Sequence, residues 1–226
     1  GDLVVETDDA CGRLLRALEE SGQEENTIVI FTANNGQEKY AYARDEKFGH
    51  WSAYPLRGLK RDIYEGGHHV PYIIKWPGIT KAGRVSDALV SQIDLMATLA
   101  TAVGFDLPDD AAEDSHNLLP LLQGQTESVR ATHVHNTHEN QYAIRHGDWL
   151  LIDHKDGYMS GRNRAWEVRH NYPPDNKSAV ELYNLKNDLG QRHDLSAQNP
   201  RRVTELRALL SSIRKQGYSA PRLNDR

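Results

Sequence analysis

The chain has 226 residues, of which 38% are hydrophobic and 26% are charged, and its formal net charge is −5. This length provides for one large domain or for a domain with a small appendage. The mild acidity argues against general nucleic-acid binding, and no apolar run approaches the roughly 20 residues that span a bilayer. The single cysteine, Cys11, excludes an internal disulfide and a cysteine-rich metal site.

The first third of the chain has the alternation of an α/β domain. Residues 3–20 repeat apolar side chains at three- and four-residue steps, which predicts a helix. Residues 27–32 form a continuous apolar, β-branched run, which is typical of a strand buried on both faces in a parallel sheet. A second strand is predicted at 70–76 and a helix at 91–103. A helix that leads straight into a buried strand is one half of an α/β unit.

A polar turn and a long irregular stretch separate the two predicted strands. The turn Asn34-Asn35-Gly36 follows the first strand, at the end of the strand where α/β sheets bind ligands. Residues 37–67 show little periodicity. A loop of this length inside a compact domain is usually functional or disordered, and the flanking strands favour a functional loop.

The second half of the chain has a different character. After a polar connector at 105–131, residues 141–145 and 149–152 flank a turn and predict a hairpin. A further strand is predicted at 181–185 and a helix at 203–213. We therefore expect an α/β fold in two parts. The predicted parts are a partial mixed sheet with flanking helices at 1–131 and a small antiparallel-sheet subdomain with a terminal helix at 132–226.

An ordered set of motifs gives this chain a family resemblance. The motifs are the helix at 8–15, the Asn34-Asn35-Gly36 turn, the Leu-Arg-Gly-Leu-Lys segment ending at Lys60, the Glu-Gly-Gly-His segment at 65–68 and the Trp-Pro-Gly segment at 76–78. In this order they resemble the sulfatase family, and residues 142–151 and 181–195 resemble its C-terminal subdomain. The resemblance implies a mixed α/β sheet of the alkaline-phosphatase type, with a smaller four-stranded C-terminal sheet.

The resemblance also implies a reaction, the hydrolysis of a sulfate ester by a formylglycine nucleophile with the help of a calcium ion. Family members form this nucleophile from a Cys or Ser in a Cys-x-Pro-x-Arg motif. Cys11 has no proline two residues on, and Asp8 and Asp9 are interpreted as solvated helix residues rather than the family's paired metal ligands. We therefore expect the C-terminal segment of a sulfatase that is inactive alone, with the N-terminal segment as its partner. The opening residues show no signal peptide and look like a continuation.

Asn34 and Asn35 are the candidate metal ligands. Their side-chain oxygens suit a hard cation such as Ca²⁺, and the alternative is an ordinary Asn-Asn-Gly turn. The family has an aspartate where this chain has Asn34. The loss of one negative charge is expected to weaken calcium binding.

Lys60 is the strongest candidate for catalysis and for sulfate binding, because its segment resembles the family's sulfate-binding lysine motif. Arg57 in the same segment is expected to be structural. His50 resembles a substrate-side histidine that contacts the sulfate or donates a proton, and the alternative is a loop histidine. His68 and His69 are interpreted as structural, because neighbours on a strand point to opposite faces.

A cluster of histidines at 133, 135 and 138 begins the second part of the chain. No further zinc ligand is evident beside them. In the family this region contributes to the substrate pocket, so His135 is a candidate substrate contact.

Three functions remain open from the sequence. The first is a sulfatase segment, the second a phosphate or phosphonate ester hydrolase of the same superfamily, and the third a non-catalytic module that binds sulfated glycans. The expected ligand is a sulfated small molecule or glycan, with no nucleic-acid or membrane partner. The resemblance implies a periplasmic or extracellular location.

Overall fold

The computed structural model describes residues 1–138, 140–173 and 178–222. The chain divides into two compact units. The first consists of Gly1–Thr32 and Pro71–Ser86, and the second of Ala33–Val70 and Asp87–Arg226. The predicted boundary at residue 131 stays a prediction.

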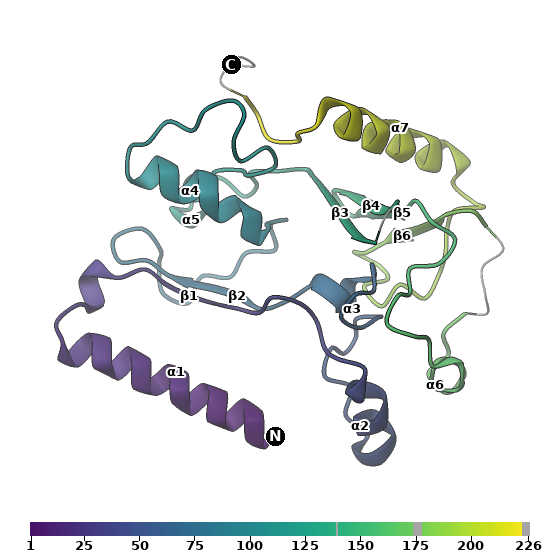
Figure 1. Cartoon of the computed structure of the whole chain (residues 1–226), viewed down its shortest axis with the longest axis horizontal. Coiled ribbons are helices and arrows are strands. Elements are labelled where there is room, and N and C mark those ends of the chain that lie inside the picture. Colours follow the sequence, from purple (N-terminus) through teal and green to yellow (C-terminus); the bar gives the residue numbers. More distant parts are fainter. Residues whose placement is uncertain (139, 174–177, 223–226) are drawn as a thin grey trace. The chain divides into compact units, whose positions relative to one another are not determined.

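The first unit contains a long helix and a two-stranded sheet (Figure 1). Its elements are α1 (Asp2–Glu20), η1 (Glu24–Asn26), β1 (Val29–Thr32) and β2 (Tyr72–Lys75). β1 and β2 pair antiparallel, with Val29 opposite Lys75. The expectation of a strand buried on both faces of a parallel sheet is wrong for this pair, because Phe31 and Ile73 are exposed. An unbroken apolar run does not reveal which face of a strand is covered.

The second unit is built on a four-stranded antiparallel sheet in the order β3-β4-β5-β6. The strands are β3 (Thr132–His138), β4 (Gln141–His146), β5 (Trp149–Ile152) and β6 (Glu181–Asn184). Helix α7 (Pro200–Gln216) lies along this sheet (Figure 1) and buries Leu206 and Leu210 against Ile144, Leu151 and Leu182. Proline at the first turn and Gly217 in a left-handed conformation at the C-terminal end define the limits of α7.

Shorter helices complete the second unit. They are α2 (Tyr40–Phe48), α3 (Glu65–His68), η2 (Gln92–Asp94), α4 (Leu95–Ala102), α5 (Leu119–Leu122) and α6 (Arg164–Arg169). The stretch 37–67, predicted to be irregular, therefore contains α2 and the start of α3. Helices α2 and α6 are joined by a hydrogen bond of 2.7 Å from Trp166 Nε1 to Asp45 Oδ2.

The predicted fold class is confirmed, with α1, the β4-β5 hairpin and α7 close to their expected positions. Strand β3 was not predicted individually, because its alternating residues are polar and histidine-rich rather than apolar. Among the described residues, no helix combines the length and the apolar character that a membrane crossing requires.

Candidate functional site

Close backbone contacts between glycines bring the predicted motifs together. The Gly36 N–H donates to the Gly67 carbonyl at 2.8 Å. A Cβ atom on Gly36 would lie 1.8 Å from the Gly66 carbonyl oxygen, and one on Gly66 would lie 2.4 Å from that of Gly58. No larger residue fits at either position. The turn at 34–36 therefore packs directly on the 58–67 segment.

The side-chain amides of Asn34 and Asn35 offer oxygen atoms as metal ligands at this contact. The Ala33 carbonyl before them accepts a 2.6 Å hydrogen bond from Gln92 Nε2, which fixes the start of the turn. Asn34 is exposed and Asn35 half-buried, and neither side-chain amide has a hydrogen-bond partner within the described parts of the chain. The donor chemistry fits calcium, but calcium takes about 6–8 oxygen ligands, so these residues can supply only part of a site. Among the described residues, no three acidic, histidine or cysteine side chains are grouped to hold a metal.

Lys60 occupies a β-turn beside the asparagine turn. The Asp62 N–H donates to the Leu59 carbonyl at 2.8 Å and closes the turn, while the Lys60 N–H donates to the Gln37 carbonyl at 2.7 Å. These bonds place the Lys60 Nζ atom 2.9 Å from Glu38 Oε1. The hydrogen bond from Lys60 lowers the pKa of Glu38. An ammonium has three N–H donors, so two remain for another anion.

The buried Asp62 carboxylate anchors this turn to a distant part of the second unit. It accepts hydrogen bonds from the main-chain N–H groups of Leu59, Met159 and Ser160 at 2.7 to 2.9 Å. The Ser160 hydroxyl donates to the same carboxylate at 2.8 Å. Burial raises the pKa of Asp62, although these hydrogen bonds oppose the shift. The position of Lys60 therefore depends on contacts about 100 residues away in sequence.

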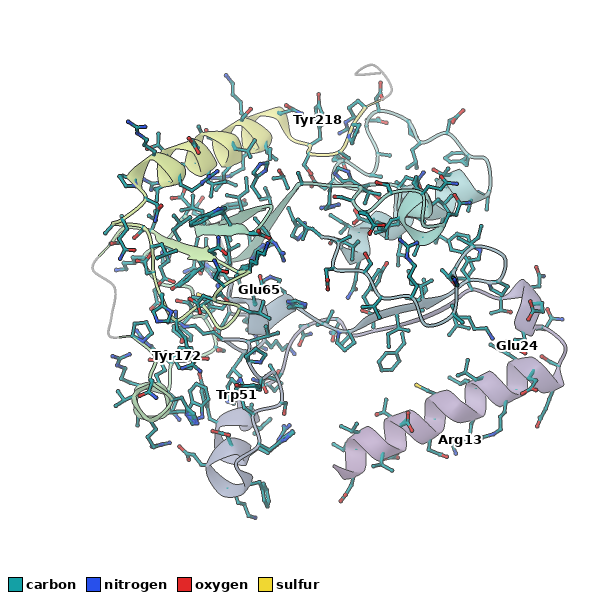
Figure 2. All side chains as sticks on the ribbon, turned by 180° about the vertical axis from the view of Figure 1, so that it is seen from behind. Arg13, Glu24, Trp51, Glu65, Tyr172 and Tyr218 are labelled. Carbon is teal, nitrogen blue, oxygen red and sulfur yellow. The ribbon has the colours of Figure 1, made fainter. Side chains whose placement is uncertain are left out.

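The segment after Lys60 enters the core of the second unit. Ile63 and Tyr64 are buried with Leu150, Ile152 and Tyr183 of the sheet. The next residue, Glu65 on α3, lies close to this sheet (Figure 2). The Lys60 turn is therefore followed directly by residues of the buried core.

His68 and His69 both contact Glu65. His69 Nδ1 lies 2.8 Å from Glu65 Oε2, and His68 Nε2 lies 3.5 Å from Oε1. The expectation that they point to opposite faces of a strand is wrong, because this segment forms the short helix α3. Burial alone would raise the pKa of Glu65, but the hydrogen bonds from both histidines hold it well below its usual range. These internal contacts agree with a structural role.

His135 lies beside the same segment. Its Nε2 is 3.1 Å from the Ile63 carbonyl oxygen, and its ring centroid is 4.1 Å from that of His68. The buried Nδ1 has no hydrogen-bond partner among the described residues. Burial lowers the pKa of His135 well below its usual value, so the ring is neutral and donates to Ile63. The structure therefore brings His135 to the motif segment.

The other two histidines of this cluster differ. The His133 ring stacks 5.7 Å from that of His135, and its Nδ1 lies 3.0 Å from Arg130 Nη1. Burial and the Arg130 charge lower the pKa of His133 to about 4. His138 is exposed and follows an irregularity in the β3-β4 register.

His50 stands apart from these contacts. It is exposed after α2 and makes no hydrogen bond or ring contact with any described residue. Its neighbour Trp51 packs 4.2 Å from Trp166 in an aromatic cluster that includes Tyr172 (Figure 2). No contact brings His50 to Lys60.

Arg57 is buried beneath the site. Its Nε donates to the Tyr158 hydroxyl at 2.8 Å, and its Nη1 donates to the Tyr183 hydroxyl at 3.0 Å and the Gln191 carbonyl at 3.1 Å. These contacts agree with the structural role expected for Arg57.

The sequence did not single out Glu38 or Asp62, which control the surroundings of Lys60. Both are carboxylates close to a motif residue, Glu38 three positions after Asn35 and Asp62 two positions after Lys60. That proximity was the available signal. It could not show which carboxylate is buried and which pairs with the lysine.

Two family models match the chain. The model described as "Sulfatase" matches residues 1–105, and the model described as "N-sulphoglucosamine sulphohydrolase, C-terminal" matches residues 58–216. The chain belongs to the sulfatase family. It corresponds to the C-terminal portion of that family, as the motif order predicted.

Similar sulfatases come from bacteria and animals. An N-acetylgalactosamine-6-O-sulfatase of Bacteroides thetaiotaomicron is 32% identical over 95% of this chain and 41% of that protein. A human N-acetylgalactosamine-6-sulfatase is 31% identical over 87% of this chain and 38% of its own length. The chain therefore spans about two fifths of the length of these relatives.

Solved sulfatase structures share the fold. One, from work on glycosaminoglycan metabolism in B. thetaiotaomicron, has a TM-score of 0.76 and 30% identity, and the match covers 95% of this chain and 44% of that one. The PsFucS1 sulfatase from Pseudoalteromonas has a TM-score of 0.69 and 25% identity, over 96% of this chain and 43% of that one.

Proposed function

We propose that this chain is the C-terminal segment of a sulfatase and that Lys60 binds the sulfate group of the ester during hydrolysis. The observation that carries the proposal is the position of the Lys60 ammonium. It lies on a turn fixed by Gln37 and Asp62, and it already holds one anion, the Glu38 carboxylate, at 2.9 Å. A lysine positioned in this way can stabilise negative charge on a sulfate oxygen once the sulfate displaces or shares the Glu38 carboxylate.

Asn34 and Asn35 would contribute two oxygen ligands to a calcium ion. When bound, calcium neutralises charge on the sulfate oxygens. The remaining ligands and the formylglycine nucleophile would come from an N-terminal segment. Asn34 in place of the family's aspartate makes the site less negative, which also favours the third function left open by the sequence, a module that binds sulfated glycans without turnover.

The two histidines would act on the substrate in different ways. His135 is neutral and held beside the Lys60 segment, so it would contact the sugar rather than the charged sulfate. His50 is exposed and unpartnered among the described residues, so it would contact the sulfate or donate a proton once the substrate is bound.

Exposed apolar surface in each unit supports the need for an N-terminal segment. No residue of α1 is buried, and its Leu3 and Leu14 are 78% and 69% exposed. On and after α4, Met96 and Val103 are 57% and 78% exposed. Soluble proteins rarely leave such groups of side chains in water. We propose that the N-terminal portion of a sulfatase fold covers them, since the relatives are more than twice as long as this chain.

The substrate we propose is a sulfated sugar. The similar enzymes from B. thetaiotaomicron and human are named for N-acetylgalactosamine 6-sulfate. Export to the periplasm or the extracellular space belongs to the same proposal, because sulfated glycans occur outside the cell.

Hydrolysis by a completed protein tests this function. The chain is joined to the N-terminal part of the B. thetaiotaomicron relative, and the folded product is assayed with an aryl sulfate and an aryl phosphate. We expect turnover of the sulfate, and about 100-fold less after Lys60→Ala. Faster turnover of the aryl phosphate than of the aryl sulfate would instead favour a phosphate or phosphonate ester hydrolase. Turnover by the 226-residue chain alone would contradict the proposal that the nucleophile lies elsewhere.

A further inference from the structure

We propose that Arg61 is a second anion-binding residue, placed beside Lys60 to bind a second negatively charged group of the substrate. This inference rests on the proposed sulfate-binding role of Lys60. It adds a substrate class, namely sugars that carry a second oxyanion, either another sulfate or a carboxylate, near the sulfate to be cleaved.

The backbone of the Lys60 turn is unusual at Arg61. Lys60 and Arg61 are the two central residues of the turn closed by the 2.8 Å hydrogen bond from Asp62 N–H to the Leu59 carbonyl. Arg61 has a φ of +77°, the conformation that the third residue of a type II turn adopts and that favours glycine or asparagine. An arginine here is strained, and strained residues that persist tend to be found at functional sites.

Contacts from two sides hold Arg61 in this conformation. The Leu59 N–H donates to Asp62 Oδ2 at 2.8 Å, and this hydrogen bond between two residues of the turn stabilises it. The Thr137 hydroxyl of β3 donates to the Arg61 carbonyl oxygen. These contacts fix the backbone but leave the side chain exposed. The guanidinium makes no hydrogen bond or ion pair with a described residue, so no such interaction accounts for an arginine at this position.

Glu38 shows that the two cations act on the same region. The Glu38 carboxylate is 2.9 Å from Lys60 Nζ. The hydrogen bond from Lys60 contributes most to lowering the pKa of Glu38, and the positive charges of Lys60 and Arg61 lower it further. An anion beside Lys60 therefore also lies in the field of Arg61.

The chemistry of the two side chains suits different groups. A lysine ammonium is a compact point charge, whereas the planar guanidinium pairs through two parallel N–H donors with a carboxylate or sulfate. A sugar with a single sulfate would use Lys60 alone. A sugar with a further sulfate, or one linked to a uronic acid, would also engage Arg61.

Binding of three probes to the full chain tests this inference. The probes are N-acetylgalactosamine 6-sulfate, the same sugar with two sulfates, and a monosulfated disaccharide that contains a uronic acid. Affinities are measured by calorimetry, and the Arg61 Nε–Hε signal is followed by NMR. We expect one or both doubly charged probes to bind about tenfold more tightly than the single sulfate, the gain of a charge-assisted hydrogen-bond pair.

Three variants distinguish the effect of the Arg61 side chain on probe preference from the effect of its backbone conformation. Arg61→Gly relieves the backbone strain and should abolish the preference while the chain stays folded. Arg61→Lys keeps the strain and the charge but loses the planar fork, so it should retain part of the preference. Ala112→Gly, at another residue with positive φ, is the control and should leave the preference unchanged.

The outcomes distinguish this inference from the proposed function. A preference that is absent in the wild type, or unchanged in Arg61→Gly while Lys60→Met still weakens every probe, would overturn the role of Arg61 alone. Binding of no probe by the wild-type chain would contradict the sulfate site itself, and this inference with it.

Discussion

Lys60 and Glu38 form an ion pair of 2.9 Å although their side chains are 33% and 40% exposed. A pair this exposed contributes little to stability, because water screens it. Its main consequence is that the proposed sulfate-binding lysine already holds a carboxylate, which an incoming sulfate must displace or share. We therefore expect Glu38→Gln to bind inorganic sulfate about two- to fivefold more tightly, corresponding to the small energy of an exposed pair.

Isothermal titration with sulfate measures this change. Glu46→Gln is the matched control, because Glu46 pairs with Arg169 rather than Lys60, at 2.5 Å and with similar exposure. Weaker sulfate binding in Glu38→Gln would show that Glu38 orients Lys60 rather than competing for it.

Asn34→Asp restores the charge that the family's calcium site carries. We expect the variant to bind calcium about tenfold more tightly than the wild type, since ligand charge tunes calcium affinity. Calcium titration of both chains checks this. Asn140→Asp adds the same charge at an exposed position and should have no effect. Equal affinities of the Asn34→Asp variant and the wild type would argue that residue 34 is not a ligand.

Asp62→Ala should destabilise the second unit by about 3 kcal/mol, because it leaves the buried main-chain N–H of Leu59 and the half-buried ones of Met159 and Ser160 without this acceptor. Urea unfolding measures the loss. Glu205→Ala removes a carboxylate that is 64% exposed and should cost about 0.5 kcal/mol or less. If Asp62→Ala lowered the free energy of unfolding by no more than this control does, the turn would not depend on the Asp62 carboxylate.

The buried histidines should make the fold sensitive to acid. The folded-state pKa of His133 is about 4, below the value near 6.5 of an unfolded chain. Between these two pH values the unfolded state binds more protons than the folded state. The stability that the neutral, buried His133 contributes is therefore present above pH 6.5 and is lost as the pH falls toward 4. We expect His133→Gln to reduce the slope of stability against pH by up to about 1.4 kcal/mol per pH unit.

Urea unfolding at several pH values between 4 and 7 measures that slope. His138→Gln is the matched control for the loss of an imidazole from β3, since His138 is exposed. A slope in His133→Gln equal to that of the wild type would assign the acid sensitivity to other groups.

The sequence predicted elements whose pattern is local. The leucine spacing of α1, the hairpin signal around Gly147 and the apolar repeat of α7 all reflect contacts within one element or between neighbours. Prediction from the sequence failed where contacts between distant segments determine the structure. The direction of β1 depends on its pairing with β2, and the polar strand β3 is held in the sheet by its pairing with β4.

The candidate site shows the same division. Lys60 and the asparagine pair stand in recognisable motifs, but the partners that position them do not. Gln37 reaches Lys60 across 23 residues, and Met159 reaches Asp62 across 97 residues. The strain at Arg61 was equally hidden, because a backbone angle depends on the hydrogen bonds that close the turn.

Titration with inorganic sulfate tests directly whether Lys60 binds a sulfate group. Inorganic sulfate is titrated into the wild-type chain, Lys60→Met and the control Lys47→Met, with NMR detection of the main-chain amides of 34–37 and 59–62. We expect the wild type and Lys47→Met to bind alike and Lys60→Met to bind at least about tenfold more weakly, the cost of losing a charge-assisted hydrogen bond. Equal sulfate affinity in Lys60→Met and the wild type would contradict the proposed sulfate-binding role of Lys60.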